Sequence, residues 1–283
     1  KVGDQATGMI SAMRYGSTVG GRYAINEGEK YTYDAEGNIT AVYENGLLKA
    51  RYTYDTLGRL IREDNKRLWK TYLYTYDDNG NILHKETAAF TLAERDAVTG
   101  TTQLYAYEGD RLTAIDGTAI EFDSMGNPSQ YKGNALQWQF GRQLAQYGST
   151  AFQYDSYGRR VRKGSIYYSY TSDGKLYKQS NGIEYLYDDK GVCGISYNGE
   201  RYYYRKNAQG DVVAMLDKDG EVVVRYEYDA WGNHEVYDGA WGLVTSETHI
   251  GKMNPLRYRG YYYDVEKCFL QTTTLLDICY VKE

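Results

Sequence analysis

The chain has 283 residues, of which 34 are tyrosine, 31 glycine and only 2 proline, and its formal net charge is −5. Disordered chains are poor in aromatic residues and rich in proline, and collagen repeats glycine at every third position, so both classes are excluded. The mild acidity argues against nucleic acid as the main partner, because phosphate binding needs a basic surface. No apolar run approaches the roughly 18 residues that a membrane-spanning helix needs.

The three cysteines, Cys193, Cys268 and Cys279, are too few for a disulfide framework, and no Cys-x-x-Cys pair suggests a zinc site. The redox compartment is therefore undecided. The chain opens on polar residues without a signal peptide. This says nothing about export, because the segment can be part of a longer protein.

A six-residue unit, Tyr-Asp-x-x-Gly followed by Asn or Arg, recurs along the chain. Six clear copies, one with phenylalanine in place of tyrosine, share an aromatic residue, an aspartate and a glycine. These signature residues are Tyr33, Asp34, Gly37, Tyr54, Asp55, Gly58, Tyr76, Asp77, Gly80, Phe122, Asp123, Gly126, Tyr154, Asp155, Gly158, Tyr228, Asp229 and Gly232. Weaker copies begin at Tyr170 and Tyr187. The later spacings are irregular, so the repeat is degenerate.

The residues before each unit alternate, as in Tyr72, Tyr74 and Tyr76, and a period of two is typical of strands. The aspartate can accept hydrogen bonds from N–H groups of a turn, and the glycine can adopt a positive φ. Each unit therefore predicts a strand, a tight turn and a second strand. Because each buried tyrosine also offers a large flat ring, we interpret nearly all tyrosines as structural.

Between the units lie residue pairs that favour two-residue hairpins, in which both central residues have positive φ. These pairs are Asn45-Gly46, Asp116-Gly117, Asn181-Gly182, Asn198-Gly199 and Asp219-Gly220. Two kinds of turn thus alternate and predict an all-β fold, an antiparallel meander of β-hairpins. Residues 87–99 are expected to form a short helix or a long insertion loop, and residues 239–251 a second insertion.

The repeated Tyr-Asp-x-x-Gly-Asn/Arg unit resembles the YD repeats of the Rhs family, over residues 31–264. Residues 203–215 resemble a strand of that family, residues 217–233 resemble its next hairpin, and residues 254–264 resemble the start of the Rhs-associated core. The resemblance implies a YD-repeat region over residues 1–228 and a partial, atypical core over 229–283, in one continuous structural unit. It also implies a curved or spiralling β-sheet shell, or part of one. Such shells enclose a C-terminal toxin in polymorphic toxins and insecticidal toxin complexes, and teneurins use a related shell.

The residues after Asp264 depart from the family pattern, and only Leu270-Gln271 resembles the expected strand. Some family members cleave off their toxin with acidic residues of the core. That motif is absent here, so the chain is expected to have no catalytic residues. The tail indicates a degenerated or frame-altered end.

Other chemistry is poorly supported by the sequence. His84 and His234 stand where the repeat places any polar residue, so both are expected to be exposed to solvent. No Gly-x-Ser-x-Gly or His-Glu-x-x-His motif occurs. Residues 217–221 hint at a calcium loop but are better explained as a hairpin at Asp219-Gly220. We therefore predict no cofactor, no metal and no enzymatic activity.

The leading hypothesis is a structural shell segment of a secreted or cell-surface bacterial Rhs-type toxin, which encapsulates or presents a C-terminal toxin. Its partners would be the remainder of a longer Rhs polypeptide or the toxin domain. The alternative is a surface module that binds carbohydrate or a partner protein through tyrosine-rich strands. A third hypothesis is self-cleavage. A sheet of this length cannot close a large cavity alone, and its open edges invite self-association.

Overall fold

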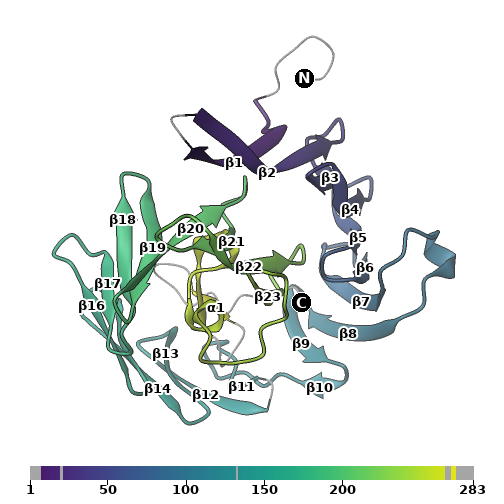
Figure 1. Ribbon diagram of the computed structural model, residues 1–283. Helices are drawn as coiled ribbons and strands as arrows, with labels where there is room; N and C mark the ends of the chain where they lie inside the picture. Colours follow the sequence, from purple (N-terminus) through teal and green to yellow (C-terminus); the bar gives the residue numbers. More distant parts are fainter. Residues whose placement is uncertain (1–7, 20–21, 132, 265–268, 272–283) are drawn as a thin grey trace. The chain divides into compact units, whose positions relative to one another are not determined.

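The computed structural model describes residues 8–19, 22–131, 133–264 and 269–271. These residues divide into two compact units. Unit 1 comprises the chain up to residue 119 together with residues 227–233, and unit 2 comprises residues 120–226 and those from 234 onward. Each unit is built on antiparallel strands that succeed one another in chain order (Figure 1).

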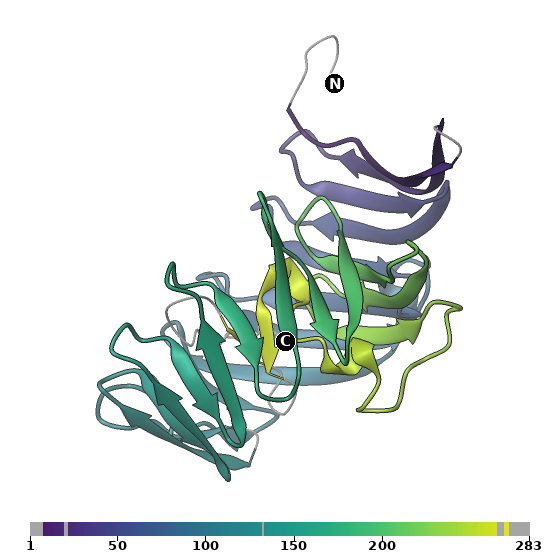
Figure 2. The same ribbon diagram turned by 60° about the vertical axis from the view of Figure 1, so that its left-hand side comes forward.

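Unit 1 contains a ten-stranded sheet in which every strand pairs with its neighbours in the sequence, so that the strands lie side by side (Figure 2). The strands are β1 (Ala12–Val19), β2 (Arg22–Tyr33), β3 (Ile39–Glu44), β4 (Leu47–Tyr54), β5 (Leu60–Asn65), β6 (Lys70–Tyr76), β7 (Ile82–Ala89), β8 (Thr101–Glu108), β9 (Arg111–Ile115) and β10 (Thr118–Ala119). The segment 227–233, with the last residues of β22 and the turn after it, completes the unit.

Unit 2 is built in the same way on the thirteen-stranded sheet of β11 to β23 and on the two-stranded sheet of β24 and β25. The strands are β11 (Gln130–Tyr131), β12 (Asn134–Gln139), β13 (Gln143–Tyr147), β14 (Thr150–Tyr154), β15 (Arg160–Lys163), β16 (Ile166–Tyr170), β17 (Leu176–Gln179), β18 (Glu184–Asp188), β19 (Gly191–Tyr197), β20 (Glu200–Lys206), β21 (Val212–Leu216), β22 (Val222–Tyr228), β23 (His234–Asp238), β24 (Tyr262–Asp264) and β25 (Phe269–Gln271). The all-β, antiparallel fold class predicted from the sequence is confirmed.

The strand pairing has a constant irregularity at the repeat unit. The tyrosine that begins a unit pairs with the residue six positions later, as in Tyr54 with Leu60 and Tyr76 with Ile82. In both pairs the register shifts directly before the tyrosine. Such a shift is a β-bulge, which increases the local twist of the sheet. The repeat therefore fixes the geometry of the hairpin end as well as its turn.

The predicted insertion after β7 forms a loop and a short 3-10 helix, η1 (Arg95–Ala97). The loop folds back over the sheet, because an Nη1 N–H of Arg62 donates to the Ala93 carbonyl at 2.8 Å and the Thr71 hydroxyl donates to the Thr91 carbonyl at 3.1 Å. The second predicted insertion leads into the one-turn helix α1 (Ile250–Met253), and a further 3-10 turn is η2 (Tyr258–Gly260). No helix in the described part of the chain exceeds four residues.

Many of the buried residues of each unit lie in the strands of its sheet. In unit 1, β5 and β6 are buried on both faces, and the fully covered side chains include Tyr72, Leu73 and Tyr74. In unit 2, Leu144 and Phe152 are central to an apolar cluster that Trp138 borders. Tyrosine thus serves as a core residue, as its amphipathic ring allows.

Candidate functional site

The signature aspartate organises the turn of each repeat unit. The Oδ1 atom of Asp55 accepts hydrogen bonds from the N–H groups of Leu57 at 3.0 Å and Arg59 at 2.9 Å. The Asp34, Asp123, Asp155 and Asp229 carboxylates accept the equivalent bond from the N–H four residues later. Hydrogen bonds from the side chain and backbone of Asn81 hold the pKa of the Asp77 carboxyl below its ordinary value. The role predicted for these aspartates in the turn is confirmed.

The signature glycines occupy a backbone region that other residues rarely adopt. Gly37, Gly58, Gly80, Gly126, Gly158 and Gly232 all have φ between 74° and 91°. An L-residue with a Cβ atom is disfavoured there by roughly 1–2 kcal/mol. The prediction that these six glycines lie in equivalent turns with positive φ is therefore confirmed.

The sixth residue of the unit links its own turn to a neighbouring turn. An Nη1 N–H of Arg59 donates to the carbonyl of Asp77, in the next unit, at 2.9 Å. The side-chain amide of Asn127 donates to the Gly141 carbonyl at 2.8 Å. Arginine and asparagine share this position because both carry N–H groups that reach their own aspartate and a neighbouring turn together. The sequence shows the alternation of the two residues but not the partner of the second bond.

The signature tyrosine makes a second link between repeats. The Tyr54 hydroxyl donates to the Ile39 carbonyl at 2.9 Å, and the Tyr76 hydroxyl donates to the Leu60 carbonyl at 2.6 Å. In both cases the acceptor is the first residue after the preceding unit. Tyr170 and Tyr187 make the same bond in unit 2. Burial raises the pKa of Tyr76 to about 12, so its hydroxyl keeps the proton that it donates.

Three predicted two-residue hairpins, at Asn45-Gly46, Asp116-Gly117 and Asn198-Gly199, have positive φ at both central residues and are confirmed. The prediction for the other two pairs was wrong. Asn181 has no positive φ, and Asp219-Gly220 belongs to a repeat-type turn. In that turn Oδ1 of Asp217 accepts the N–H groups of Asp219 and Glu221, both at 2.9 Å. The signal was present in the sequence as Leu-Asp-x-x-Gly, with leucine in place of tyrosine.

Two further repeat-type turns escaped the sequence pattern. At residues 207–211 asparagine replaces the aspartate, and Oδ1 of Asn207 accepts the N–H groups of Gln209 and Asp211. At residues 238–242 the glycine position holds Trp241, with a φ of 71°. The centre of that ring lies 4.7 Å from the Arg225 guanidinium carbon.

A buried polar cluster in unit 1 joins the sheet to the segment 227–233. We call Glu63, Asn65, Lys85, Asp229 and Trp231 with Tyr74 the Glu63 cluster. The Glu63 carboxylate accepts a hydrogen bond from the Ala230 N–H at 2.8 Å and another from the Asn65 amide at 2.9 Å. The Nζ atom of Lys85 lies 3.9 Å from Oδ2 of Asp229. A signature aspartate thus serves its own turn and a buried charge cluster at once.

The adjacent charges of unit 1 are balanced. The Lys49 ammonium lies 3.1 Å from a carboxylate oxygen of Glu29 and 3.1 Å from one of Glu227. Burial alone would lower the pKa of Lys49, but the two carboxylates offset this and raise it above its ordinary value. On the opposite face, Asp64 pairs with Arg51 at 2.7 Å and Arg62 at 2.8 Å. Neither network was visible in the sequence.

A second buried cluster lies in unit 2, and we call Arg160, Lys163 and Asp264 the Asp264 cluster. Both terminal nitrogens of Arg160 donate to the Asp264 carboxylate at 2.9 Å, and the Lys163 ammonium donates to it at 2.7 Å. Burial raises the pKa of Asp264, but the two cations more than offset this, so the pKa lies below its ordinary value. The rings of Phe152 and Tyr262 lie near the guanidinium, 5.1 Å and 5.7 Å from its carbon.

The three histidines have different environments. His84 is exposed, as predicted. The same prediction for His234 was wrong, because His234 is half-buried and its Nε2 atom forms a short hydrogen bond with the Arg257 guanidinium. The residues that cover it, such as Tyr263, come from the insertion and the strand after it, which the repeat pattern does not describe. Nδ1 of His249 accepts the Gly251 N–H at 3.1 Å and caps helix α1.

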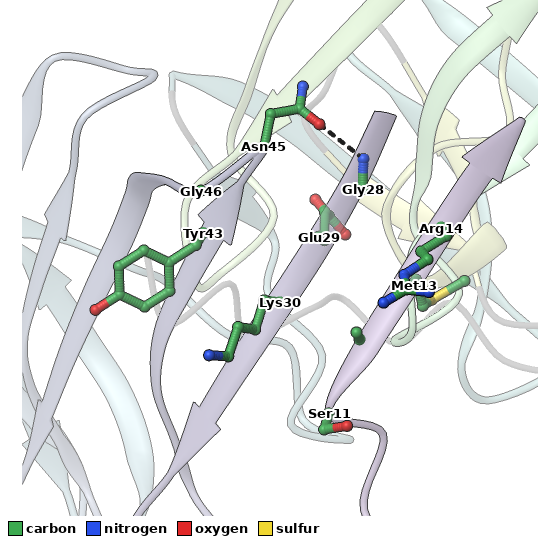
Figure 3. A pocket seen from close by; sticks show the side chains of 10 residues that line it. Ser11, Met13, Arg14, Gly28, Glu29, Lys30, Tyr43, Asn45 and Gly46 are labelled. Atoms are coloured by element: carbon green, nitrogen blue, oxygen red, sulfur yellow. Dashed lines mark hydrogen bonds between the residues drawn. The ribbon is translucent and has the colours of Figure 1, made fainter. Parts of the chain in front are cut away.

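A surface hollow lies over β1, β2 and β3 in unit 1, where Gly28 presents no side chain (Figure 3). Oδ1 of Asn45 accepts the Gly28 N–H at 2.9 Å across this hollow (Figure 3). Its other lining residues include Arg14, Lys30 and Tyr43. These side chains are of mixed charge and type, so the hollow does not specify a ligand. The described residues contain no group of three or more metal-ligating side chains.

Comparison with known proteins places these repeats in context. The RHS Repeat family matches residues 33–66. The chain is 27% identical over 244 residues to the tRNA3(Ser)-specific nuclease WapA of Bacillus spizizenii, and 29% identical over 244 residues to the tRNA nuclease WapA of Bacillus subtilis strain 168. Each match covers 84% of this chain but only 8% of the relative. The chain thus spans a small part of the length of these proteins.

Solved structures share the fold at low identity. The crystal structure of TcdB2-TccC3 without its hypervariable C-terminal region matches 88% of this chain and 15% of that chain, with a TM-score of 0.62 and 15% identity. The structure of TcdB2-TccC3-TEV matches 89% of this chain and 15% of that chain, with a TM-score of 0.60 and 15% identity. None of the helices in the described ranges is long and apolar enough to cross a membrane.

Proposed function

We propose that the chain is an Rhs-type YD-repeat protein and a non-enzymatic, structural shell segment of a longer bacterial toxin polypeptide. In this proposal the complete protein is secreted or displayed at the cell surface, and its shell encloses or presents a C-terminal toxin. Residues 1–228 form its YD-repeat region and residues 229–283 a partial core. The partners are the rest of the polypeptide and the toxin domain.

The observation that carries the proposal is the pair of links between successive repeats. The signature tyrosine bonds the strand end of the preceding unit, and the sixth residue bonds a neighbouring turn, as Tyr76 and Arg59 show. Each repeat is therefore completed by another repeat, which suits a sheet that grows by adding hairpins. A catalytic group is needed once in one geometry, whereas these contacts recur in both units.

The relatives support the same role. Two of them are named as tRNA nucleases, and the TcdB2-TccC3 structure that shares the fold was solved without a hypervariable C-terminal region. We infer that a toxin activity, where one is present, belongs to a part of the polypeptide other than this repeat segment. The buried clusters suit a structural role, because Asp264 is only 1% exposed and is bonded on both oxygens.

The alternative, a binding module that uses its tyrosine-rich strands, is weaker. Signature tyrosines such as Tyr54 and Tyr76 already donate their hydroxyl groups to backbone carbonyls of the same sheet. Their rings and polar atoms are thus committed to the fold. We do not favour a carbohydrate or protein ligand for these strands.

The proposal is tested with the purified chain and with the longer polypeptide that contains it. The chain alone should not cleave itself, tRNA or a peptide substrate. In the longer polypeptide, deletion of residues 31–264 should expose the C-terminal domain to added protease, which gel electrophoresis measures over time. An activity of the isolated chain that disappears on a single Asp264→Asn or His234→Gln change would contradict the structural role, and so would unchanged protease resistance after the deletion.

A further inference from the structure

The Glu63 cluster contains two neighbouring carboxyl groups that are closed off from water. Glu63 is 0% exposed and Asp229 is 3% exposed. One oxygen of Glu63 accepts the N–H of Ala230, the residue directly after Asp229, at 2.8 Å. The other oxygen accepts the Asn65 amide, and the second N–H of that amide group donates to the Tyr228 carbonyl at 2.8 Å. Glu63 is therefore the buried anchor of the segment 227–233.

The positive charge available to this pair is limited. The Nζ atom of Lys85 lies 3.9 Å from Asp229 and 5.2 Å from the centre of the Tyr72 ring. Lys49 is shared between Glu29 and Glu227. Titratable and charged groups face Glu63 from β4, β6, β7 and the segment 227–233. These are Tyr52, Tyr54, Tyr72, Tyr74, Lys85 and Asp229.

Two further polar groups lie buried in the Glu63 cluster. The Tyr74 hydroxyl and the Trp231 indole N–H are both buried, and they interact with each other without forming a hydrogen bond of normal geometry within the described residues. Their rings meet edge to face, with centroids 5.9 Å apart.

Burial, followed by the nearby Asp229 carboxylate, raises the pKa of Glu63 to about 8 from its ordinary value of 4.5. The Ala230 N–H, the Asn65 amide and Lys85 oppose this increase without cancelling it. Two carboxylates that share a closed site cannot both ionise cheaply, so the pair retains a proton near neutral pH.

We propose that the Glu63 cluster is a proton-controlled latch, which holds residues 227–233 within unit 1 when Glu63 is protonated and weakens that hold as Glu63 ionises. The neutral carboxyl group keeps one oxygen for the Ala230 N–H and removes the repulsion from Asp229. The ionised group leaves two buried negative charges beside the single ammonium group of Lys85. The chain thus carries a pH-sensitive contact between segments more than 160 residues apart in sequence.

The direction of the pH dependence results from proton binding. The folded segment binds a proton more tightly than the opened segment, so the opening equilibrium rises with pH. It should increase about tenfold per pH unit between about pH 5 and pH 8, and level off above about pH 8. Hydrogen–deuterium exchange of the full chain, followed by mass spectrometry of peptides covering 227–233, measures this opening at each pH.

The decisive comparison is with Glu63→Gln, which resembles the protonated side chain and does not titrate. Comparing both proteins at the same pH removes the intrinsic pH dependence of exchange. Between pH 6 and pH 8, the protection factor of residues 227–233 should fall tens of fold further in the wild type than in the variant. The reason is that the opening equilibrium of the wild type rises about tenfold per pH unit over this range. The control variant Glu36→Gln, at an exposed turn of the same unit, should behave as the wild type.

A second variant keeps the test decisive where Glu63→Gln does not fold. Asp229→Asn preserves the turn, because Asn207 fills the same position in the turn at residues 207–211. It removes the like charge beside Glu63, so the loss of protection should level off at a lower pH than in the wild type. Equal pH dependence of residues 227–233 in the wild type and in the folded variant would overturn the proposal.

Discussion

The aspartate and the tyrosine of one repeat unit stabilise different parts of the fold. The Asp55 carboxylate satisfies N–H groups within its own turn, whereas the Tyr54 hydroxyl bonds the carbonyl of Ile39, fifteen residues earlier. The first contact is local and exposed, and the second joins two hairpins through a half-buried ring. The two residues adjoin in sequence but should therefore differ in their energetic contribution.

Truncation of Tyr54 should destabilise the chain more than truncation of its neighbour. We expect Tyr54→Ala to lower the free energy of unfolding by about 2–3 kcal/mol, less than in an ordinary core because the ring is only half-buried. Tyr54→Phe, which removes only the hydroxyl, should cost about 1 kcal/mol. Asp55→Ala should cost less than Tyr54→Ala, because it removes only hydrogen bonds within its own turn, by analogy with helix caps. The exposed control His84→Ala should stay within about 0.5 kcal/mol. Urea denaturation measures each value, and an equal effect of all four would contradict this ranking.

Replacement of a signature glycine should strain the turn without creating a clash. Gly58 has a φ of 74°, and the nearest atom to an added Cβ would be Nδ2 of Asn38 at 3.9 Å. Gly58→Ala should therefore cost about 1–2 kcal/mol from backbone conformation alone. Leu57→Ala, at the adjacent position that is 73% exposed, is the matched control and should be nearly neutral. Thermal melting of both variants separates these effects, and equal melting temperatures would rule the strain out.

At the scale of the element, the hairpin depends on the backbone conformation of its turn more than on any one residue type. Alternating tyrosines and the Asp-x-x-Gly spacing were sufficient to predict strands, turns and antiparallel order. They did not predict the turns at Asn207 and Trp241, because an asparagine accepts the same N–H bonds and a well-packed tryptophan tolerates a positive φ. Asp-x-x-Gly is therefore the most frequent sequence for this turn, but other residues can adopt the same backbone conformation.

The link between hairpins can be tested at the sixth position of the repeat unit, by replacing arginine with asparagine, the other residue found at this position. Arg59→Ala removes the bonds to Asp55 and to the Asp77 carbonyl and should cost about 1 kcal/mol, a modest value because the ion pair is partly exposed. Arg59→Asn should recover at least half of this loss, because Asn127 makes the corresponding pair of bonds at its own turn. Chemical denaturation measures both variants. An asparagine variant no more stable than the alanine variant would show that the second bond contributes nothing.

At the scale of the whole molecule, the contacts that sequence reasoning missed are those between distant segments. Glu63 meets Ala230 across 167 residues, and Arg160 meets Asp264 across 104 residues. A repeat pattern predicts that consecutive strands pair, but it does not predict which turn contacts which distant strand. Apart from Asp229, a signature aspartate, the charged residues of both clusters appeared in the sequence as ordinary polar positions. Their partners come from distant segments, and the repeat pattern does not predict which distant segments pack together.

The two clusters should give the molecule opposite sensitivities to acid and base. The folded pKa of Asp264 is lowered, so its contribution is present above the ordinary value of 3.8 and is lost as pH falls through the folded value. The folded pKa of Glu63 is raised to about 8, so its contribution is present below the ordinary value of 4.5 and is lost as pH rises toward 8. The unfolding free energy should therefore be greatest at about pH 5 and fall on both sides.

Denaturation of the full chain between pH 3 and pH 9 checks this profile, with one variant for each limb. Glu63→Gln should flatten the fall between about pH 5 and pH 8 and leave the acid limb unchanged. Asp264→Asn should reduce the fall of the unfolding free energy at acid pH and leave its fall at alkaline pH unchanged. The variant should also be less stable at every pH, because Arg160 and Lys163 lose their shared carboxylate. The two clusters share no residue and no hydrogen-bond partner, so the effects of the two substitutions should be independent. A wild-type profile that rises steadily from pH 5 to pH 8 would show that Glu63 is ionised in the folded chain.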